Sequence, residues 1–415
     1  MQVLVLNSGS SSIKYRLFGD GGDGGMTPGA TGGVAAALEE LAAGLIERIG
    51  ESEGRLTHRI TRGSTREEQV EERRVADHAD GFDALIRVLE EAELISALAA
   101  IGHRVVHGGA EFVAPTVIDD RVIERIRAQI PLAPLHNPAN LTGIEVATRL
   151  RPDVPQVAVF DTAFHATLPP HAYRYAVAEE VVTRHGVRRY GFHGTSHAYV
   201  SRRAAEHLGR DDLAMITLHL GNGASAAAID AGRSVDTSMG LSPLEGLVMG
   251  TRSGDLDPAV VFHLVRQAGM SLDEVDELLN RRSGLVGMCG DNDLRVVQQR
   301  ADHGDEAAAT ALEVYAYRLR KYVGAYTAAL GRLDALVFTA GVGENDAAMR
   351  ARVVDGLGVL GLTIDPERNT AADVHAAPDG VADLHPDGAA VAVLAVATDE
   401  EREIATESLQ AVRAG

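Results

Sequence analysis

Three short segments of the sequence place glycine beside small polar residues directly after an apolar run. They are residues 7–12, 221–223 and 341–343. Glycine lacks a Cβ atom, so the backbone N–H groups of such a tip can approach an anion closely. One such segment is weak evidence, but three in one chain predict a protein that binds phosphate groups. The chain lacks the G-x-x-x-x-G-K-[ST] pattern, which excludes a P-loop enzyme.

Five charged or titratable residues are candidates for the chemistry. Arg104 and Arg252 lie in glycine-containing segments, where guanidinium groups suit the binding of anions; the alternative for Arg104 is a surface ion pair. Asp161 and Glu400 follow predicted strands, at the sheet edge where open α/β folds bind ligands. For Glu400 the alternative is a favourable interaction with a helix dipole. His193 precedes a predicted helix, and its alternative is a structural histidine.

Metal sites built from histidine or cysteine are not expected. The pairs His103/His107 and His193/His197 are each spaced four residues apart, but neither has a third ligand nearby. Cys289 is the single cysteine, so it forms neither an internal disulfide nor a cysteine zinc site.

The apolar periodicity predicts the elements that position these residues. It predicts strands within residues 2–6, 13–18, 99–109, 156–160 and 213–230, and at the start of segments 333–346 and 390–415. It predicts helices within residues 34–50, 82–98, 140–150, 190–209 and 305–331 and at the end of segment 390–415, and one that opens at Pro258. Residues 19–33 are expected to be a loop and residues 64–80 a charged, solvated segment. Strands and helices alternate, so the predicted class is α/β.

An internal repeat indicates a duplicated domain. Residues 213–230 follow the same strand–tip–strand plan as residues 2–18, and an offset of 214 aligns Gly9 with Gly223 and Ser11 with Ser225. We expect two related domains whose tips face a shared cleft. The alternative is a chance match of one short hairpin.

The composition excludes several function classes. With 39 basic and 59 acidic residues the net charge is −20, which disfavours binding to nucleic acid or to an anionic membrane. Tryptophan is absent and aromatic residues make up 4%, so a base-stacking platform is not expected. No window holds 18 consecutive apolar residues, and the first residues lack a signal-peptide pattern. These features predict a cytoplasmic protein.

Eight segments, in order along nearly the whole chain, resemble the acetate kinases. They read LNSGSSSIKY (6–15), GHRVVHGG (102–109), PLHNPANL (134–141), FDTAFH (160–165), YGFHGTSH (190–197), HLGNGAS (219–225), DTSMGLSPLEGLVMGTRSGDLDP (236–258) and AGVGEN (340–345). The resemblance implies the fold of acetate and sugar kinases, Hsp70 and actin, with two duplicated actin-like (ribonuclease H-like) domains around a nucleotide cleft. It implies an N-terminal domain of residues 1–161 plus 398–415, a nucleotide-binding domain of residues 162–397, and a homodimer. The implied reaction is reversible, Mg²⁺-dependent (or Mn²⁺-dependent) phosphoryl transfer from ATP to acetate.

The resemblance also implies a role for individual residues. Asn7 and Glu400 would hold Mg²⁺, and Arg104, Arg252 and His193 would contact the transferring phosphoryl group and acetate. The phosphates would lie near Ser10, Ser12 and Lys14. The acetate methyl group would occupy a pocket formed by Val106, Leu135, Phe192 and Pro243. The nucleotide would be bound by His219, Leu220, Gly221, Asn222, Gly223, Asp293, Leu294, Arg295, Gly341, Val342, Gly343, Glu344 and Asn345.

Asp161 is implied to be the essential acidic residue, but the chemistry argues against a general base. Acetate is already ionised at neutral pH, since carboxyl pKa values lie near about 4. We therefore interpret Asp161 as a residue that holds Mg²⁺ or an arginine.

One segment departs from the family pattern. Residues 290–296 read GDNDLRV where the family has a Ser-Ser-Asp-x-Arg-Asp run, which leaves the nucleotide-base preference open. Two alternatives to acetate kinase are a kinase of propionate or another short-chain acid and, more remotely, a non-catalytic nucleotide-binding module on the same fold.

Overall fold

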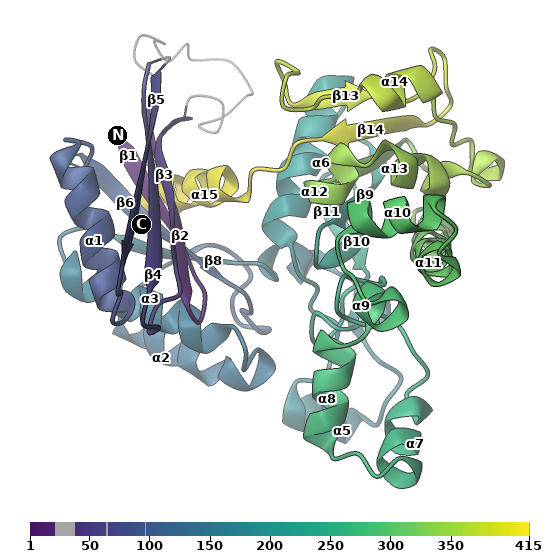
Figure 1. The fold of residues 1–415 in the computed structure, drawn as a ribbon, viewed down its shortest axis with the longest axis horizontal. Helices are drawn as coiled ribbons and strands as arrows, with labels where there is room; N and C mark the ends of the chain where they lie inside the picture. The colour runs from purple at the N-terminus through teal and green to yellow at the C-terminus, as the bar shows by residue number, and fades with distance from the viewer. Residues whose placement is uncertain (21–37, 64, 96, 415) are drawn as a thin grey trace. The chain divides into compact units, whose positions relative to one another are not determined.

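The computed structural model describes residues 1–20, 38–63, 65–95 and 97–414, which form two compact units (Figure 1). Unit 1 comprises Met1–Ala163 with Asp399–Gly415, and unit 2 comprises Phe164–Thr398. The short 3-10 helix η3 (Ala163–Thr167) begins at the boundary where the chain leaves unit 1.

Unit 1 is a mixed sheet with helices packed against it. Its strands, in the order β5-β4-β3-β2-β1-β6-β8-β7, are β1 (Gln2–Ser8), β2 (Ser12–Asp20), β3 (Leu38–Glu47), β4 (Gly54–Arg62), β5 (Thr65–Arg73), β6 (Leu98–Val105), β7 (Thr116–Val117) and β8 (Gln156–Phe160). Its helices are α1 (His78–Glu91), α2 (Asp120–Ala128), η2 (Ile130–Leu132), α3 (Asn137–Leu150) and α15 (Glu400–Ala414). Strands β1, β6 and β8 run parallel, so their carboxyl ends meet at one edge.

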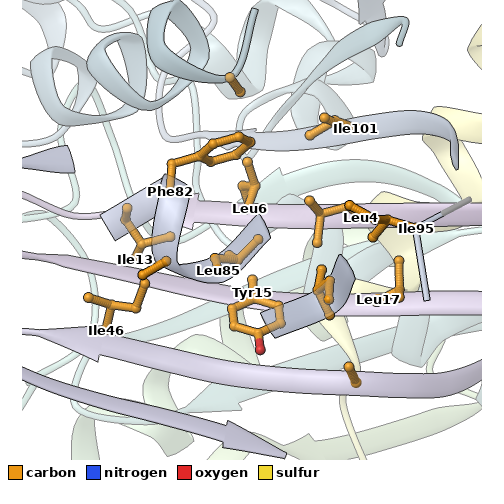
Figure 2. Packing of buried hydrophobic residues seen from close by; sticks show 14 of the residues in the cluster. Leu4, Leu6, Ile13, Tyr15, Leu17, Ile46, Phe82, Leu85, Ile95 and Ile101 are labelled. Carbon is orange, nitrogen blue, oxygen red and sulfur yellow. The ribbon is translucent and has the colours of Figure 1, made fainter. Parts of the chain in front are cut away.

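The alternation of side chains along β1 gives unit 1 two apolar layers. Leu4 and Leu6 lie on the face that packs with Phe82 of α1 (Figure 2). Val3 and Val5 lie on the opposite face, in the cluster that includes Ile404 and Leu409 of α15. Both faces of the strand are therefore buried, which explains its continuous apolar run.

Unit 2 contains a second sheet with the order β11-β10-β9-β12-β14-β13. Its strands are β9 (Ala214–Leu220), β10 (Ala224–Asp230), β11 (Arg233–Thr237), β12 (Ala335–Thr339), β13 (Val381–Asp383) and β14 (Ala392–Val396). Its helices are α4 (Pro170–Tyr173), α5 (Glu179–His185), α6 (Gly194–Leu208), α7 (Ala259–Gln267), α8 (Leu272–Arg281), α9 (Gly284–Cys289), α10 (Leu294–Asp302), α11 (Glu306–Leu330), α12 (Ala340–Asn345), α13 (Ala347–Val354), η4 (Gly358–Leu360) and α14 (Pro366–Ala371). Helix α6 packs on β9, β12 and β14, and α11 packs on β9, β10 and β11.

The two sheets share one topology, which confirms the predicted duplication and the actin-like fold class. The order β3-β2-β1-β6-β8-β7 of unit 1 corresponds to β11-β10-β9-β12-β14-β13 of unit 2. The senses of pairing also agree: the second and third strands are antiparallel, and the third, fourth and fifth are parallel. The long helix that follows the fifth strand packs on the other sheet in each case. Helix α6 comes after β8, η3, α4 and α5 and packs on the sheet of unit 2, and α15 comes after β14 and packs on the sheet of unit 1.

The two hairpin tips match, but at a different offset from the predicted one. The N–H of Gly9 donates to the carbonyl of Ser12 (2.8 Å), and that of Gly221 donates to the carbonyl of Gly223 (3.0 Å). Gly9 therefore corresponds to Gly221, which is 221 − 9 = 212 positions further on. The alignment at 214 is wrong, because Ser225 lies inside β10 and not in the tip.

The prediction of a helix over residues 34–50 is also wrong. Residues 38–47 form β3, which pairs with β2 on one side and with β4 on the other. These long-range pairings outweigh the helical propensity of the alanine- and leucine-rich sequence. The charged segment 65–73 forms strand β5, whose exposed charged side chains protect the edge of the sheet. The predicted loop over residues 19–33 lies outside the described residues from residue 21 onward.

Candidate active site

Four polar side chains of unit 1 gather where its parallel strands end. Asn7, Arg104 and Asp161 lie at or just beyond the carboxyl ends of β1, β6 and β8. Two positions before each of these residues lies a residue that packs on α15, namely Val5, Gly102 and Val159. Side chains alternate along a strand, so the three polar side chains lie on this same face of the sheet. Glu400 is the first residue of α15. Strand alternation and one covering helix thus place residues that are up to 393 positions apart (400 − 7) on the same side of the sheet.

Arg104 and Asp161 form a bidentate ion pair within this group. Arg104 Nε donates to the two carboxylate oxygens of Asp161 at 2.9 and 3.2 Å, and Arg104 Nη2 donates to Oδ2 at 2.7 Å. A carboxylate oxygen of Glu400 lies 3.8 Å from the same Nη2. Burial by itself lowers the pKa of Arg104, but the charges of Asp161 and Glu400 outweigh it and raise that pKa. Burial raises the pKa of Asp161, and the Arg104 charge opposes this shift.

The carboxylate of Glu400, whose ion pair with Arg104 is long, suits a hard cation. Within the described residues Glu400 accepts no hydrogen bond, and its side chain is only 18% exposed. Asn7 supplies an amide oxygen at the end of the neighbouring strand. Mg²⁺ is usually held by one or two such oxygens together with water and substrate phosphates. The donor set therefore fits Mg²⁺ bound partly by the substrate. Among the described residues, no group of three or more histidine, cysteine or acidic side chains could hold a metal ion.

The tip between β1 and β2 carries the residues expected near the phosphates. Ser10 is exposed in this turn, and the carbonyl of Gly9 is hydrogen-bonded to His78 Nε2 at 2.8 Å. Ser12 closes the turn. Lys14 projects from β2 and forms an ion pair of 2.5 Å with Glu401, the residue next to Glu400. In this structure the Lys14 ammonium therefore neutralises a carboxylate at the start of α15.

The four residues expected around the acetate methyl group divide between the two units. In unit 1, Val106 is half-buried just after β6, and its N–H donates to Asn140 Oδ1 at 3.1 Å. Leu135 is 55% exposed. In unit 2, Phe192 is buried and Pro243 is half-buried.

Unit 2 contains a pocket of about 310 Å³ that brings together three of the predicted nucleotide segments. The predicted residues that line it are Gly221, Asn222, Asp293, Leu294 and Val342. The sequence reasoning missed four others, namely Gly250, Leu285, Asn292 and Tyr315. Asn292 Nδ2 donates to Asn222 Oδ1 at 3.0 Å, so the segment that departs from the family pattern forms part of the pocket wall.

Gly250 is required for this wall. A Cβ atom there would lie 2.1 Å from Asn222 Oδ1, which is far inside a contact distance. The N–H of Gly250 also donates to the carbonyl of Asn222 at 3.0 Å. Gly250 could have been predicted from the sequence, because it lies two residues before the candidate Arg252 in the same glycine-containing segment.

Arg295 does not line the pocket. Its side chain is 89% exposed and forms an ion pair with Asp293 at 2.6 Å. Hydrogen bonds from Arg295 and from backbone N–H groups lower the pKa of Asp293 to about 2. In this structure Asp293 therefore begins α10 as an ionised N-cap.

The third glycine segment, residues 341–343, lies inside the short helix α12 and not in a turn that precedes a helix. Glu344 is buried, and its Oε1 accepts the N–H groups of Ala340 and Thr398, each at 2.9 Å. The buried guanidinium of Arg350 donates to the carbonyls of Gly343 and Glu344 at 3.0 and 2.8 Å. These contacts fix the backbone that places Val342 in the pocket wall. In helix α12 itself, Asn345 Nδ2 donates to the carbonyl of Gly341 at 2.9 Å.

His193 and Arg252 lie against the same glycine in unit 2. A Cβ atom on Gly223 would lie 3.5 Å from His193 Nε2 and 3.5 Å from Arg252 Nη1, an ordinary contact distance, so both polar atoms border the same small space. His193 has a φ of 55°, a left-handed conformation that is uncommon for a residue other than glycine and typical of functional sites. Its ring stacks on His219 at 4.1 Å.

Arg252 has no acidic partner among the described residues. Its hydrogen bonds run from Nη1 to the carbonyl of Pro243 (3.3 Å) and to Met249 Sδ (3.7 Å). Burial lowers its pKa, and no carboxylate offsets the shift. A desolvated guanidinium without a counterion is a site for an anion.

The loop that carries Arg252 is held by Arg189, which the sequence reasoning missed. Arg189 Nη1 donates to the carbonyls of residues 237–239, and Nη2 donates to Glu245 at 2.6 Å. The acceptors of Arg189 lie about 50 residues further along the chain, and most of them are backbone carbonyls. No local sequence pattern therefore identifies Arg189.

Each histidine of the two spaced pairs has a hydrogen bond to at least one ring nitrogen. His103 Nε2 is bonded to Gln156 at 2.7 Å, and burial lowers the pKa of His103 to about 4. His107 Nδ1 accepts the N–H of Gly109 at 2.9 Å. His197 is bonded to Thr217 and Ser225. Both pairs thus have structural partners.

Residues 2–406 match the family model described as the acetokinase family. The acetate kinase of Streptomyces griseus is 56% identical over 99% of this chain and 96% of its own length. Two solved structures superpose with a TM-score of 0.88, each covering 99% of both chains: the Porphyromonas gingivalis acetate kinase, at 41% identity, and a Francisella tularensis propionate kinase, at 39%. None of the described helices is long and apolar enough to cross a membrane.

Proposed function

The chain belongs to the acetokinase family, and we propose that it catalyses the reversible transfer of a phosphoryl group from ATP to acetate, giving ADP and acetyl phosphate. The observation that best supports this function is Arg252, a half-buried arginine without an acidic partner among the described residues. It shares the space beside Gly223 with His193, and the hairpin tip that contains Gly223 also forms part of the pocket wall. An unpaired guanidinium near this pocket suits the transfer of a phosphoryl group between two anions.

The chemistry assigns distinct tasks to the residues of the two units. The transferring phosphoryl group carries charge on its equatorial oxygens, which planar guanidinium groups bind better than ammonium groups do. We assign Arg104 and Arg252 to these oxygens and to the acetate carboxylate. Asn7 and Glu400 would hold Mg²⁺, which when bound supplies positive charge to the phosphate oxygens. Asp161 positions Arg104 and does not accept a proton.

An assay of acetyl phosphate formation from ATP with acetate, propionate and butyrate tests the proposal. We expect acetate to give the highest kcat/KM. A preference for propionate would make the chain a propionate kinase with the same mechanism. No phosphorylated product from any of the three acids would overturn the assignment and favour a non-catalytic nucleotide-binding module.

Val106→Ala is expected to shift acyl selectivity toward longer acids. Removing two methyl groups from the proposed pocket leaves room for an additional methylene, which is worth about 1 kcal/mol of discrimination. The measurement is kcat/KM for acetate, propionate and butyrate. Val113→Ala is a matched control, because Val113 is exposed in the same unit. Equal losses for all three acids would remove Val106 from the pocket.

Glu400→Ala is expected to raise the Mg²⁺ concentration needed for half-maximal activity at least tenfold, because one of two proposed protein ligands is lost. Glu401→Ala is a sharp control: Glu401 is the next residue of the same helix turn and pairs with Lys14. If Glu400 only interacts with the helix dipole, the two variants should need similar Mg²⁺ concentrations for half-maximal activity. If Glu400 binds the metal, only Glu400→Ala should need more Mg²⁺.

We also propose that the protein is a homodimer, as its family resemblance implies. Light scattering coupled to size exclusion is expected to give twice the chain mass of 43.8 kDa. A monomer mass at micromolar concentration would contradict this.

A further inference from the structure

A chain of four hydrogen-bonded side chains leads from the core of unit 2 to His193. Thr217 Oγ1 lies 2.7 Å from His197 Nδ1, His197 Nε2 lies 2.7 Å from Ser225 Oγ, and Ser225 Oγ lies 2.8 Å from His193 Nδ1. Thr217, His197 and Ser225 are completely buried. They come from β9, α6 and β10, so the sequence gives no sign that they are connected.

The hydroxyl group of Ser225 has one proton but faces two ring nitrogens. It can donate to one of them only, so the other must carry its own proton and donate to Ser225. If Ser225 donates to His193 Nδ1, then His197 is protonated on Nε2, and the proton of a neutral His193 is on Nε2. If the chain runs in the opposite direction, His193 carries its proton on Nδ1 instead. The tautomers of the two histidines are therefore coupled.

The groups around His193 favour the arrangement in which Ser225 donates to His193 Nδ1 when an anion is bound. Nε2 of His193 lies on the side of Arg252, since both atoms are 3.5 Å from the Cβ position of Gly223. An anion held by Arg252 needs an N–H donor from His193 and would be repelled by a ring lone pair. Burial, together with the nearby rings of His165 and His219, lowers the pKa of His197 far enough to keep it neutral. The titratable groups near the chain are thus His165, His219 and Arg252.

We propose that Ser225 and His197 are positioning residues that hold His193 as a neutral ring with its proton on Nε2, directed at the transferring phosphoryl group. This inference rests on the proposed function, because it assigns the anion at Arg252. Ser225 contacts no substrate, and its effect passes through the ring of His193. The left-handed backbone of His193, which is the N-cap of α6, directs Nδ1 inward to Ser225.

The tautomers can be read without turnover from the ¹⁵N shifts of histidine-labelled protein with Mg²⁺ADP and acetate. We expect both His193 and His197 to be protonated on Nε2 and unprotonated on Nδ1. A proton on Nδ1 of His193, or unlike tautomers in the two rings, would overturn the proposal. This measurement is independent of activity, so it stays informative if the preferred acid is not acetate. It uses the unaltered protein and needs no variant to fold.

Ser225→Ala is expected to lower kcat about 10²-fold with less than a threefold change in the KM for ATP, since the His193 ring loses its orienting partner. Ser234→Ala is the matched control. Ser234 Oγ is buried and lies 2.8 Å from Nδ1 of another buried histidine, His165, whose Nε2 donates to the carbonyl of Phe192. Ser234→Ala should leave kcat within threefold. Equal losses in kcat for the two variants would show that Ser225 is merely structural and would contradict the proposal.

Discussion

Arg252→Ala is expected to lower kcat by about 10³-fold or more, the range known for arginines that stabilise transferring phosphoryl groups, without lowering the melting temperature. We expect activity to fall without a loss of stability because Arg252 has no acidic partner among the described residues, so its removal leaves no buried carboxylate unpaired. Burial lowers its pKa, so its charge is less favourable in the folded than in the unfolded chain and reduces stability at neutral pH. Arg252→Lys should recover little activity, because an ammonium group cannot form the planar fork.

Arg104→Ala is expected to lower kcat to a similar extent but also to destabilise the fold. Its removal leaves the carboxylate of Asp161, only 2% exposed, without its bidentate partner, which costs about 3 kcal/mol. Steady-state kinetics and thermal melts of both variants test the contrast. Arg210→Ala is the control, since Arg210 pairs with Asp212 on the surface. Loss of ATP binding with an unchanged kcat in Arg252→Ala would contradict its assignment to the phosphoryl group.

Asp161→Asn is expected to lower kcat by about 10²-fold or more at every pH between 6 and 9, because Arg104 loses the carboxylate that orients it. Asp161→Glu should also fail, since an additional methylene displaces the guanidinium. The pH dependence of the unaltered enzyme follows from the same pair. Burial raises the pKa of Asp161, so the paired form is present above that pKa and is lost as the pH falls through it, at a higher pH than for an exposed aspartate.

An acid limb in the pH profile therefore arises whether Asp161 positions Arg104 or accepts a proton, and a double variant separates the two roles. If Asp161 acts through Arg104, the variant carrying both Asp161→Asn and Arg104→Ala should be no slower than Arg104→Ala alone. Losses that multiply would show an independent role such as general base catalysis. Asp399→Asn is the matched control, because Asp399 pairs with Arg16 and Arg402 near the start of α15.

Local sequence patterns were sufficient to predict the strand ends that carry the charged group of unit 1. Asn7 and Asp161 each follow a continuous apolar run, and Arg104 follows a segment that begins with one; such runs predict buried strands without knowledge of their neighbours. The repeated hairpin predicted the duplication in the same way. Three of the predicted nucleotide segments contribute to one pocket. Gly221 and Asn222 lie in a tight turn, which glycine and small polar residues mark in a sequence, whereas Val342 lies in helix α12.

Other features depended on contacts between residues far apart in the chain. Residues 38–47 form a strand because β2 and β4 pair with them, and the helical pattern of their side chains could not show this. The partners of charged side chains are equally non-local: Lys14 is paired with Glu401, whereas Arg252 is left without a carboxylate among the described residues. Neither outcome is visible in the sequence around each residue.

The positioning residues were decided by the tertiary structure alone. Arg189 and Arg350 are held mainly by backbone carbonyls, and a carbonyl is present at every residue, so no side-chain pattern marks these sites. Ser225 lies between His193 and His197 only because β10 pairs with β9, on which α6 packs. The sequence by itself predicted which groups could carry the chemistry, because their type and their place near the end of a strand are local properties. Only the tertiary structure decided which of them are paired, buried or free to bind an anion, because ion pairing and desolvation depend on distances in space.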